Sequence, residues 1–317
     1  MGRHRKTRRE LKKQRKIIVV SLIAFLFIMV GGYAAFQTNL SITAKGNIKE
    51  PSRVIMLFPW ATTEYFYSDY YRETIVNVTF LGTNKVSSNA IESWDVSEDG
   101  KGGVMAWVVP TSEDNTKYDL YIGANGGVIA NKDSRCLFFN MLALQNINFN
   151  NNFDTSNVTN MQWMFAGSNS LTSLNLSNFD TTNVQSMSGM FSTWDPIANK
   201  FGTSSLQNII FGENFKTNNV TNMGDMFSGF QGTNLDLSSF DTFNVINMYH
   251  MFNGCGNLKE LNLCSFSTSK VTDMGGMFMN THNIKNIYVG ASWTTTGAET
   301  TDLFANSGVS SVTTGQC

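Results

Sequence analysis

Apolar side chains recur at fixed intervals through the second half of the chain. A thirteen-residue motif occurs five times, as FDTSNVTNMQWMF (153–165), FDTTNVQSMSGMF (179–191), FKTNNVTNMGDMF (215–227), FDTFNVINMYHMF (240–252) and FSTSKVTDMGGMF (266–278). In each copy Val, Met and the closing Met-Phe pair have the spacing of one face of a short helix. The invariant Thr at the third position is a residue type that caps helices. The motif therefore predicts a short helix with a buried apolar face.

A second apolar pattern separates the copies of the motif. In LTSLNL (171–176) and LKELNL (258–263) apolar and polar residues alternate. This alternation is typical of a short strand with one buried face. The Met-Phe pairs of the five copies lie 26, 36, 25 and 26 residues apart, and the extra residues fall in 192–205, where Pro and Gly predict a surface loop.

Weaker copies extend the repeats at both ends, at Leu137-Phe138 and at Leu303-Phe304. A strand and a short helix cannot enclose a core alone, but stacked copies can. A period in the twenties with one strand and one helix is the leucine-rich-repeat arrangement. The sequence thus predicts an α+β, leucine-rich-repeat-like solenoid over residues 119–317.

The beginning of the chain has a different pattern. Residues 1–16 contain nine Lys or Arg and one Glu, a basic tail, and the uncharged IIVVSLIAFLFIMVGGYAAF (17–36) follows. Such a segment spans roughly 30 Å as a helix, one bilayer core, and basic residues flank the cytoplasmic side. The prediction is a single-pass protein of the cell membrane with a transmembrane anchor over 17–36, a cytoplasmic N-terminus and an extracellular C-terminal domain. The alternative is a cleavable signal peptide, because GGYAA is rich in small residues.

A spacer and a cap are predicted between the anchor and the repeats. Residues 37–51 are polar and end at Pro, which predicts a spacer. Over 52–118, alternating segments joined by Gly-rich turns predict a β-rich N-terminal cap region, and Asn125-Gly126 beyond it predicts a hairpin. Aromatic residues cluster over 60–71. This cluster either covers the first edge of the repeats or forms an exposed contact for a carbohydrate or protein.

Composition and motifs limit the possible chemistry. Only 15% of the residues are charged, and no HExxH, GxSxG, paired Cys/His spacing or phosphate-binding loop occurs. We therefore expect no enzymatic activity, no catalytic residues, no metal site and no cofactor. A nucleic-acid partner is also not expected, because a hydrophobic span directly follows the basic run.

Isolated polar and sulfur-containing residues have structural interpretations. His250 and His282 occupy variable repeat positions, which predicts that they lie on the surface. Asp154, Asp180 and Asp241 recur once per repeat, which predicts a turn or cap ladder. No disulfide framework is evident among the four cysteines, and Cys255 and Cys264 are predicted to be small buried residues.

The repeats resemble the BspA-type leucine-rich-repeat surface proteins of bacteria. The resemblance rests on FDTSNVTNM-x-x-MF followed by LTSLNLSNFDTTNV and covers about Asp119 to Ser311. ESWDVSEDGKGGVMAWV (92–108) and YDLYIGANGGVIANKDS (118–134) are similar to the segment that precedes such repeats. The resemblance implies a cell-surface location and a binding or adhesion role, without catalytic residues.

The strands also predict a surface for a ligand. In L-x-L the middle residue points outward, and the outward column that also contains Ile210 supplies the candidate ligand-binding residues Asn148, Asn175, Asp236, Asn262 and Tyr288. This polar, faintly acidic column fits many weak hydrogen bonds to a protein or glycan. We expect a membrane-anchored extracellular repeat protein that presents a solenoid surface for binding or adhesion. The alternative is a passive structural cell-envelope component or spacer without a dedicated ligand.

Overall fold

The computed structural model describes residues 54–59, 65–111, 116–195, 200–201 and 204–317. The predicted basic tail, anchor and spacer (1–16, 17–36 and 37–51) lie outside these residues. Within the described ranges no helix is both long enough and apolar enough to cross a bilayer. This finding contradicts the predicted single-pass membrane location.

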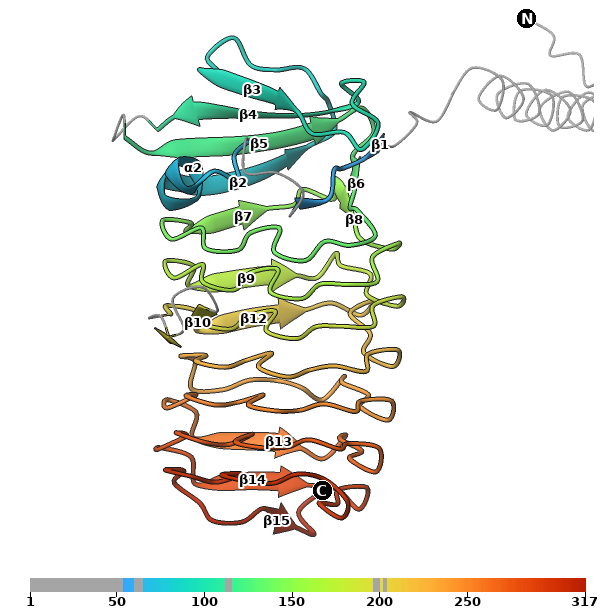
Figure 1. Cartoon of the computed structure of the whole chain (residues 1–317), viewed down its shortest axis with the longest axis vertical. Coiled ribbons are helices and arrows are strands. Elements are labelled where there is room, and N and C mark those ends of the chain that lie inside the picture. Colours follow the sequence, from blue (N-terminus) through green and yellow to red (C-terminus); the bar gives the residue numbers. More distant parts are fainter. Residues whose placement is uncertain (1–53, 60–64, 112–115, 196–199, 202–203) are drawn as a thin grey trace, which may run out of the picture. The chain divides into compact units, whose positions relative to one another are not determined.

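A mixed five-stranded sheet precedes the repeats. Its spatial order is β3 (Glu92–Asp95), β4 (Val104–Pro110), β5 (Tyr118–Ala124), β2 (Ile75–Leu81) and β7 (Asn146–Asn148) (Figure 1). The β3–β4 and β4–β5 pairs are antiparallel, whereas β5–β2 and β2–β7 are parallel. The strands predicted before residue 119 are therefore present, and β7 adds the first repeat strand to the same sheet.

The predicted hairpin at Asn125-Gly126 is wrong. A tight turn does occur there, because the N–H of Gly127 donates to the carbonyl of Ala124 at 3.0 Å and Gly126 and Gly127 have φ of 81° and 100°. However, β5 continues into β6 (Val128–Ile129), which pairs in parallel with β1 (Val54–Ile55) and β8 (Phe153–Asp154) in a separate sheet. The turn therefore carries the chain from one sheet to another.

The aromatic residues before β2 lie mostly inside the protein. Phe66 and Tyr67 are buried, Tyr71 is nearly so, and Tyr70 is exposed. Tyr71 and Tyr70 belong to α2 (Asp69–Thr74), the only helix among the described residues. Burial of these rings favours the interpretation that they cover the edge of the array.

The repeats contribute short strands that follow β7 down the molecule (Figure 1). β9 (Ser173–Leu176) pairs in parallel with β12 (Asn208–Phe211). Further on, β13 (Glu260–Leu263), β14 (Asn286–Val289) and β15 (Thr313–Thr314) form a second parallel sheet. The predicted surface loop at 192–205 contains a small antiparallel pair, β10 (Trp194–Asp195) and β11 (Lys200–Phe201).

The helices predicted within the motif are absent. The residue before each closing Met-Phe pair has a positive φ, at Trp163 (54°), Gly189 (62°), Asp225 (56°), His250 (55°) and Gly276 (56°). A residue in this left-handed conformation cannot continue a right-handed helix. The spacing of Val, Met and Phe therefore comes from a series of turns, which brings side chains to one side as a helix would.

The predicted fold class, an α+β leucine-rich-repeat-like solenoid with a transmembrane helix, is therefore wrong. The described residues form five small sheets of two to five strands, and six-residue α2 is their only helix. The motif does not use hydrogen bonds within a helix. Instead, alternate N–H groups donate to the next repeat, as Met187 does to Asn222 and Phe191 to Met226, both at 3.0 Å.

The apolar residues of the motif form the core that the pattern predicted. Val184, Met187 and Met190 are completely buried, with an exposed fraction of 0%. Phenyl rings stack through the repeats with centroids 5.3 to 5.9 Å apart, in the order Phe138, Phe165, Phe191, Phe227, Phe252, Phe278 and Phe304. The first and last rings belong to the weaker copies, which therefore continue the array.

The invariant Thr joins neighbouring repeats and does not cap a helix. The buried Thr242 hydroxyl donates to the carbonyl of Ser267 at 2.9 Å and accepts from its N–H at 2.8 Å. The same pair of bonds joins Thr155 to Asp180, Thr217 to Asp241 and Thr268 to Thr294. The hydroxyl of Thr181, in the copy before the longer interval, donates to the carbonyl of Lys216 at 2.6 Å. A hydroxyl can both donate and accept at one atom, so the residue at this position can join two repeats through a single side chain.

Thr242→Val should lower the free energy of unfolding by about 1–3 kcal/mol, because it leaves the partly buried N–H and carbonyl of Ser267 without their partner. The measurement is urea denaturation followed by circular dichroism. Thr182→Val is the matched control, since Thr182 is exposed. Equal stability of the two variants would contradict the role assigned to the buried hydroxyl.

Phe227→Ala should lower the free energy of unfolding by about 3–5 kcal/mol, because it removes a ring from the middle of the stack and leaves a cavity. The same denaturation measurement applies. Phe243→Ala is the comparison, since the Phe243 side chain is 53% exposed and its loss opens no internal cavity. A loss below about 1 kcal/mol for Phe227→Ala would show that the stack contributes little, well under the usual cost of such a cavity.

Candidate ligand-binding surface

The structure places the predicted ligand-binding residues on strands and on the strand-like segment 234–237. Asn148, Asn175, Asp236 and Asn262 are exposed, and Tyr288 is half-buried. Asn175 lies opposite Ile210 across the β9–β12 pair, and Asn262 lies opposite Tyr288 across β13–β14. We call these five residues together with Ile210 the strip.

Four side chains of the strip also hold the turn that follows their strand. In each case Oδ1 accepts a hydrogen bond from the N–H two residues ahead, at 3.1 Å for Asn148 and 3.0 Å for Asn175, Asp236 and Asn262. Asp and Asn make this type of turn because their short side chains reach their own backbone. The strip is therefore built from residues with a structural role, and only their remaining polar atom faces outward.

The recurrent Asp residues behave in the same way. Oδ1 of Asp154, Asp180 and Asp241 accepts from the N–H two residues ahead, each at 3.0 Å. This confirms the predicted turn ladder.

The strand ladder is interrupted in the middle of the strip. No backbone hydrogen bond among the described residues joins Leu235–Leu237 to β12 or to β13. The interval between Met226 and Met251 is 25 residues, one shorter than the interval of 26 that follows it. The shortening lies before Leu235, because the stretch from Phe227 to Leu235 is one residue shorter than that from Phe252 to Leu261. Leu235–Leu237 therefore does not align with the neighbouring strands for pairing.

Shallow grooves flank the interrupted segment. One is lined by Asn234–Ser238 with Glu260, Asn262 and Tyr288. The other is lined by Ile209–Glu213 with Asp236, Ser238 and Ser239. Asp236, Asn262 and Tyr288 of the strip therefore meet in one groove, whereas Asn148 and Asn175 lie outside both.

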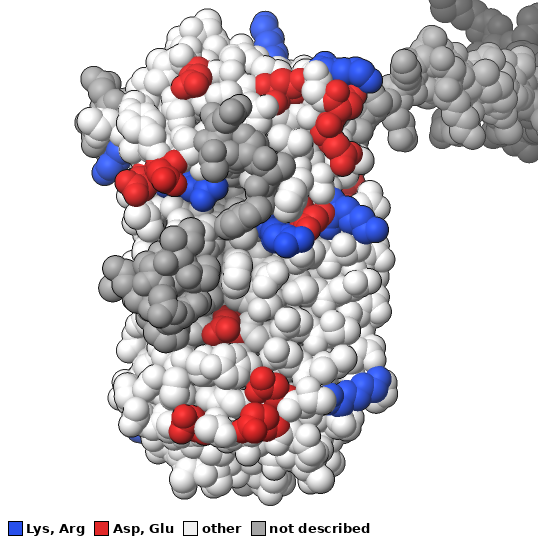
Figure 2. Space-filling view, viewed as in Figure 1, with Lys and Arg blue, Asp and Glu red and all other residues white. Residues whose placement is uncertain are grey.

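The grooves carry negative charge on an otherwise sparsely charged molecule. Hydrogen bonds from the N–H and hydroxyl of Ser238 lower the pKa of Asp236, which keeps its carboxylate ionised. Glu260 adds a second carboxylate to the first groove, and its Oε1 accepts from Asn286 at 3.2 Å. Figure 2 shows that most of the face it displays is uncharged and that its acidic side chains lie in small groups.

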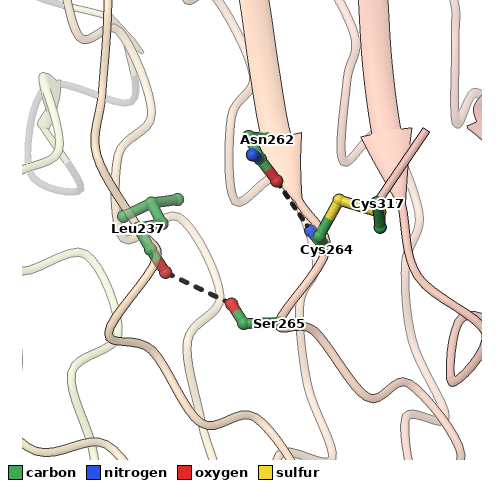
Figure 3. The surroundings of a disulfide bond; sticks show 5 residues. All are labelled: Leu237, Asn262, Cys264, Ser265 and Cys317. Carbon is green, nitrogen blue, oxygen red and sulfur yellow. Dashed lines mark hydrogen bonds between the residues drawn. A yellow bond between two sulfur atoms is a disulfide. The ribbon is translucent and has the colours of Figure 1, made fainter.

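A disulfide that the sequence did not predict lies beside this groove. Cys264, at the end of β13, is bonded to Cys317, with Cα atoms 5.7 Å apart (Figure 3). The N–H of Cys264 is also the donor to Asn262. The prediction that Cys264 is a small buried residue is therefore wrong, since it is half-buried and bonded. The partners are 53 residues apart, so no short spacing revealed the pair. Cys255 is buried as predicted.

A second group of polar residues lies in the motif. The Asp225 carboxylate is 3.7 Å from Nδ1 of His250, whose ring stacks on Tyr249 with centroids 3.8 Å apart. Burial raises the pKa of Asp225 to about 7, and burial lowers the pKa of His250 against the opposing charge of two nearby carboxylates. His282 is exposed as predicted, but His250 is half-buried.

One sequence signal for the position of His250 was available. The next repeat has Gly276 at the same motif position, and a Cβ there would meet the His250 ring at 2.3 Å. The glycine therefore makes the space that the imidazole fills.

The chain belongs to the family described as Mycoplasma protein of unknown function, DUF285. The family model matches residues 133–211 and 195–312, which together contain every copy of the thirteen-residue motif and the whole strip. No curated protein and no solved structure matches the chain.

Asp225→Asn should change how stability depends on pH. The folded pKa of Asp225, about 7, is above the unfolded value of about 3.9, so its contribution is full below the unfolded pKa and is lost as pH rises through about 7. His250, with a lowered pKa, acts in the opposite direction and destabilises the fold as pH falls below its unfolded value of about 6.5. Relative to the wild type, Asp225→Asn should therefore gain stability between about pH 4 and pH 7.

The measurement is thermal unfolding across that pH range. The control is Asp241→Asn, because Asp241 is exposed and Asn keeps the oxygen that accepts the turn hydrogen bond from the N–H of Phe243. Parallel pH profiles of the wild type and Asp225→Asn would contradict the assignment.

Proposed function

We propose that this chain is a non-catalytic binding protein whose strip contacts a protein or glycan ligand, and that it is related to the BspA-type surface proteins that its motif resembles. The observation that carries the proposal is the groove in which Asp236, Asn262 and Tyr288 meet. These three residues come from three successive repeats, so the groove exists only when the repeats pack together.

The groove has the chemistry of a polar recognition surface. The two carboxylates accept hydrogen bonds from hydroxyl and amide groups, and the amide of Asn262 can both accept and donate. The half-buried ring of Tyr288 gives an apolar surface with a polar tip. The turn hydrogen bonds of Asp236 and Asn262 already restrict their side chains. Less conformational entropy is therefore lost when a ligand binds.

A passive structural role is the second candidate. It is favoured by the turn hydrogen bonds of Asn148, Asn175, Asp236 and Asn262, because these bonds give a structural reason for an Asn or Asp at this position in four of the repeats. The two candidates differ in the groove itself, where Glu260 and Tyr288 are not part of such turns.

The test begins with the full chain on glycan and protein arrays. Glu260→Lys and Tyr288→Ala should then weaken binding of the ligand found by at least about tenfold, or about 1.4 kcal/mol each. Glu260→Lys reverses a groove charge without removing a turn acceptor, and Asp236→Asn removes a charge while keeping the acceptor oxygen. Thr182→Lys, in the motif, is the control.

Circular dichroism of every variant should match that of the wild type. If neither array yields a ligand, or if the groove variants bind as well as Thr182→Lys, the binding role fails and the passive role is favoured.

A further inference from the structure

Every junction between repeats uses the same row of four backbone donors. At the last junction the N–H groups of Met274, Gly276, Phe278 and Asn280 donate to the carbonyls of Glu299, Thr301, Leu303 and Ala305 at 2.8 to 2.9 Å. The corresponding four bonds occur at all six junctions from residue 134 onward, with N···O distances of 2.7 to 3.0 Å. Inside the array, each row of donors is thus covered by a stretch of the next repeat that presents alternate carbonyls.

The last copy has the same row of backbone N–H groups, but no following repeat supplies carbonyl acceptors for it. The equivalent positions are Thr300, Asp302, Phe304 and Asn306, and their N–H groups have no backbone partner among the described residues. The N–H of Thr300 lies against the carboxylate of its neighbour Glu299. Asp302 and Asn306 have φ of 58° and 55°, close to 56° for Gly276 and 60° for Asn280. The backbone therefore keeps the geometry of an internal junction although nothing pairs with it.

The ring stack is open at the same place. The six preceding rings are at most 3% exposed, whereas Phe304 is half-buried and contacts a stacked ring on one side only, that of Phe278 at 5.4 Å. In the internal repeats the second face of the ring is covered by the next Phe. An aromatic ring is thus the group that fits the free face of Phe304.

A second copy of this chain does not fit the open edge. The opposite end of the stack is closed, because Phe138 is fully buried and packs against Phe80 of β2 at 6.3 Å. Two open edges facing each other would place donors against donors. The occupant must instead supply carbonyl acceptors from another polypeptide.

The charge of this end gives a further condition. Residues 286–317 contain Glu299 and Asp302, both exposed, and no Lys or Arg. A segment with a basic residue near its aromatic side chain is therefore complementary. Such pairing of an extended segment with a free row of backbone groups is an established mode of peptide recognition.

We propose that residues 299–306 form a docking edge for an extended, basic, aromatic-containing segment of a partner protein, which accepts hydrogen bonds from the four N–H groups of this row and stacks a ring on Phe304. The partner occupies the place that a further repeat would take. This edge is distinct from the strip, so the inference does not rest on the proposed function.

The probe is a synthetic peptide of residues 215–231 with Asp225→Gly, FKTNNVTNMGGMFSGFQ, which has the four acceptors of an internal repeat, one Lys, no acidic side chain and the stacking Phe. Hydrogen exchange of the full chain, read by mass spectrometry, compares residues 299–306 with the internal residues 273–280. In the free chain the first segment should exchange fast and the second slowly. The peptide should slow exchange of 299–306 at least about tenfold, as expected when hydrogen bonds close solvent-exposed amides.

Controls separate this edge from other causes. Phe304→Ala should weaken peptide binding at least tenfold, whereas Phe243→Ala and Glu260→Lys should not, and the peptide with Phe227→Ala should lose the protection. The proposal is overturned if a saturating peptide leaves 299–306 unprotected, if a scrambled peptide protects equally, or if these amides are already protected in the free monomer.

Discussion

The hydrogen bonds between neighbouring repeats are the constraint on which the rest of the structure depends. Each repeat satisfies alternate backbone donors with the carbonyls of the next one, so its own backbone cannot also form a helix. A buried donor or acceptor without a partner costs far more than a single bond gains. The period of the repeats, the left-handed residue before each Met-Phe pair and the invariant Thr all follow from this requirement.

The sequence was sufficient to predict the core but not the backbone that carries it. Val184, Met187 and Met190 were correctly placed inside, and LTSLNL and LKELNL were correctly placed in strands. The helix was wrong because a spacing of three and four residues records which side chains share a face, not how the backbone reaches that face. Only the recurring glycines at the position of Trp163 and His250, at Gly189 and Gly276, indicated a left-handed residue there.

The candidate surface was predictable to a similar degree. Alternation in the strands was enough to place the strip outward, and three of its residues meet in a groove. The groove itself depends on one residue missing before Leu235, a feature visible in the repeat intervals but without meaning until the register of the strands is known. The pairing of Cys264 with Cys317 joins segments that are distant in sequence, and periodicity contains no information about such a bond.

The disulfide has a mechanical consequence. It joins the end of β13 to the last residue of the chain and closes a loop of 53 residues that includes β14 and β15. When the last residue is pulled, tension passes through the sulfur atoms to Cys264 and bypasses the two terminal repeats. Unravelling under load would then start at the Phe252 layer, deep in the array, and the outermost layers would remain folded until that bond was reduced.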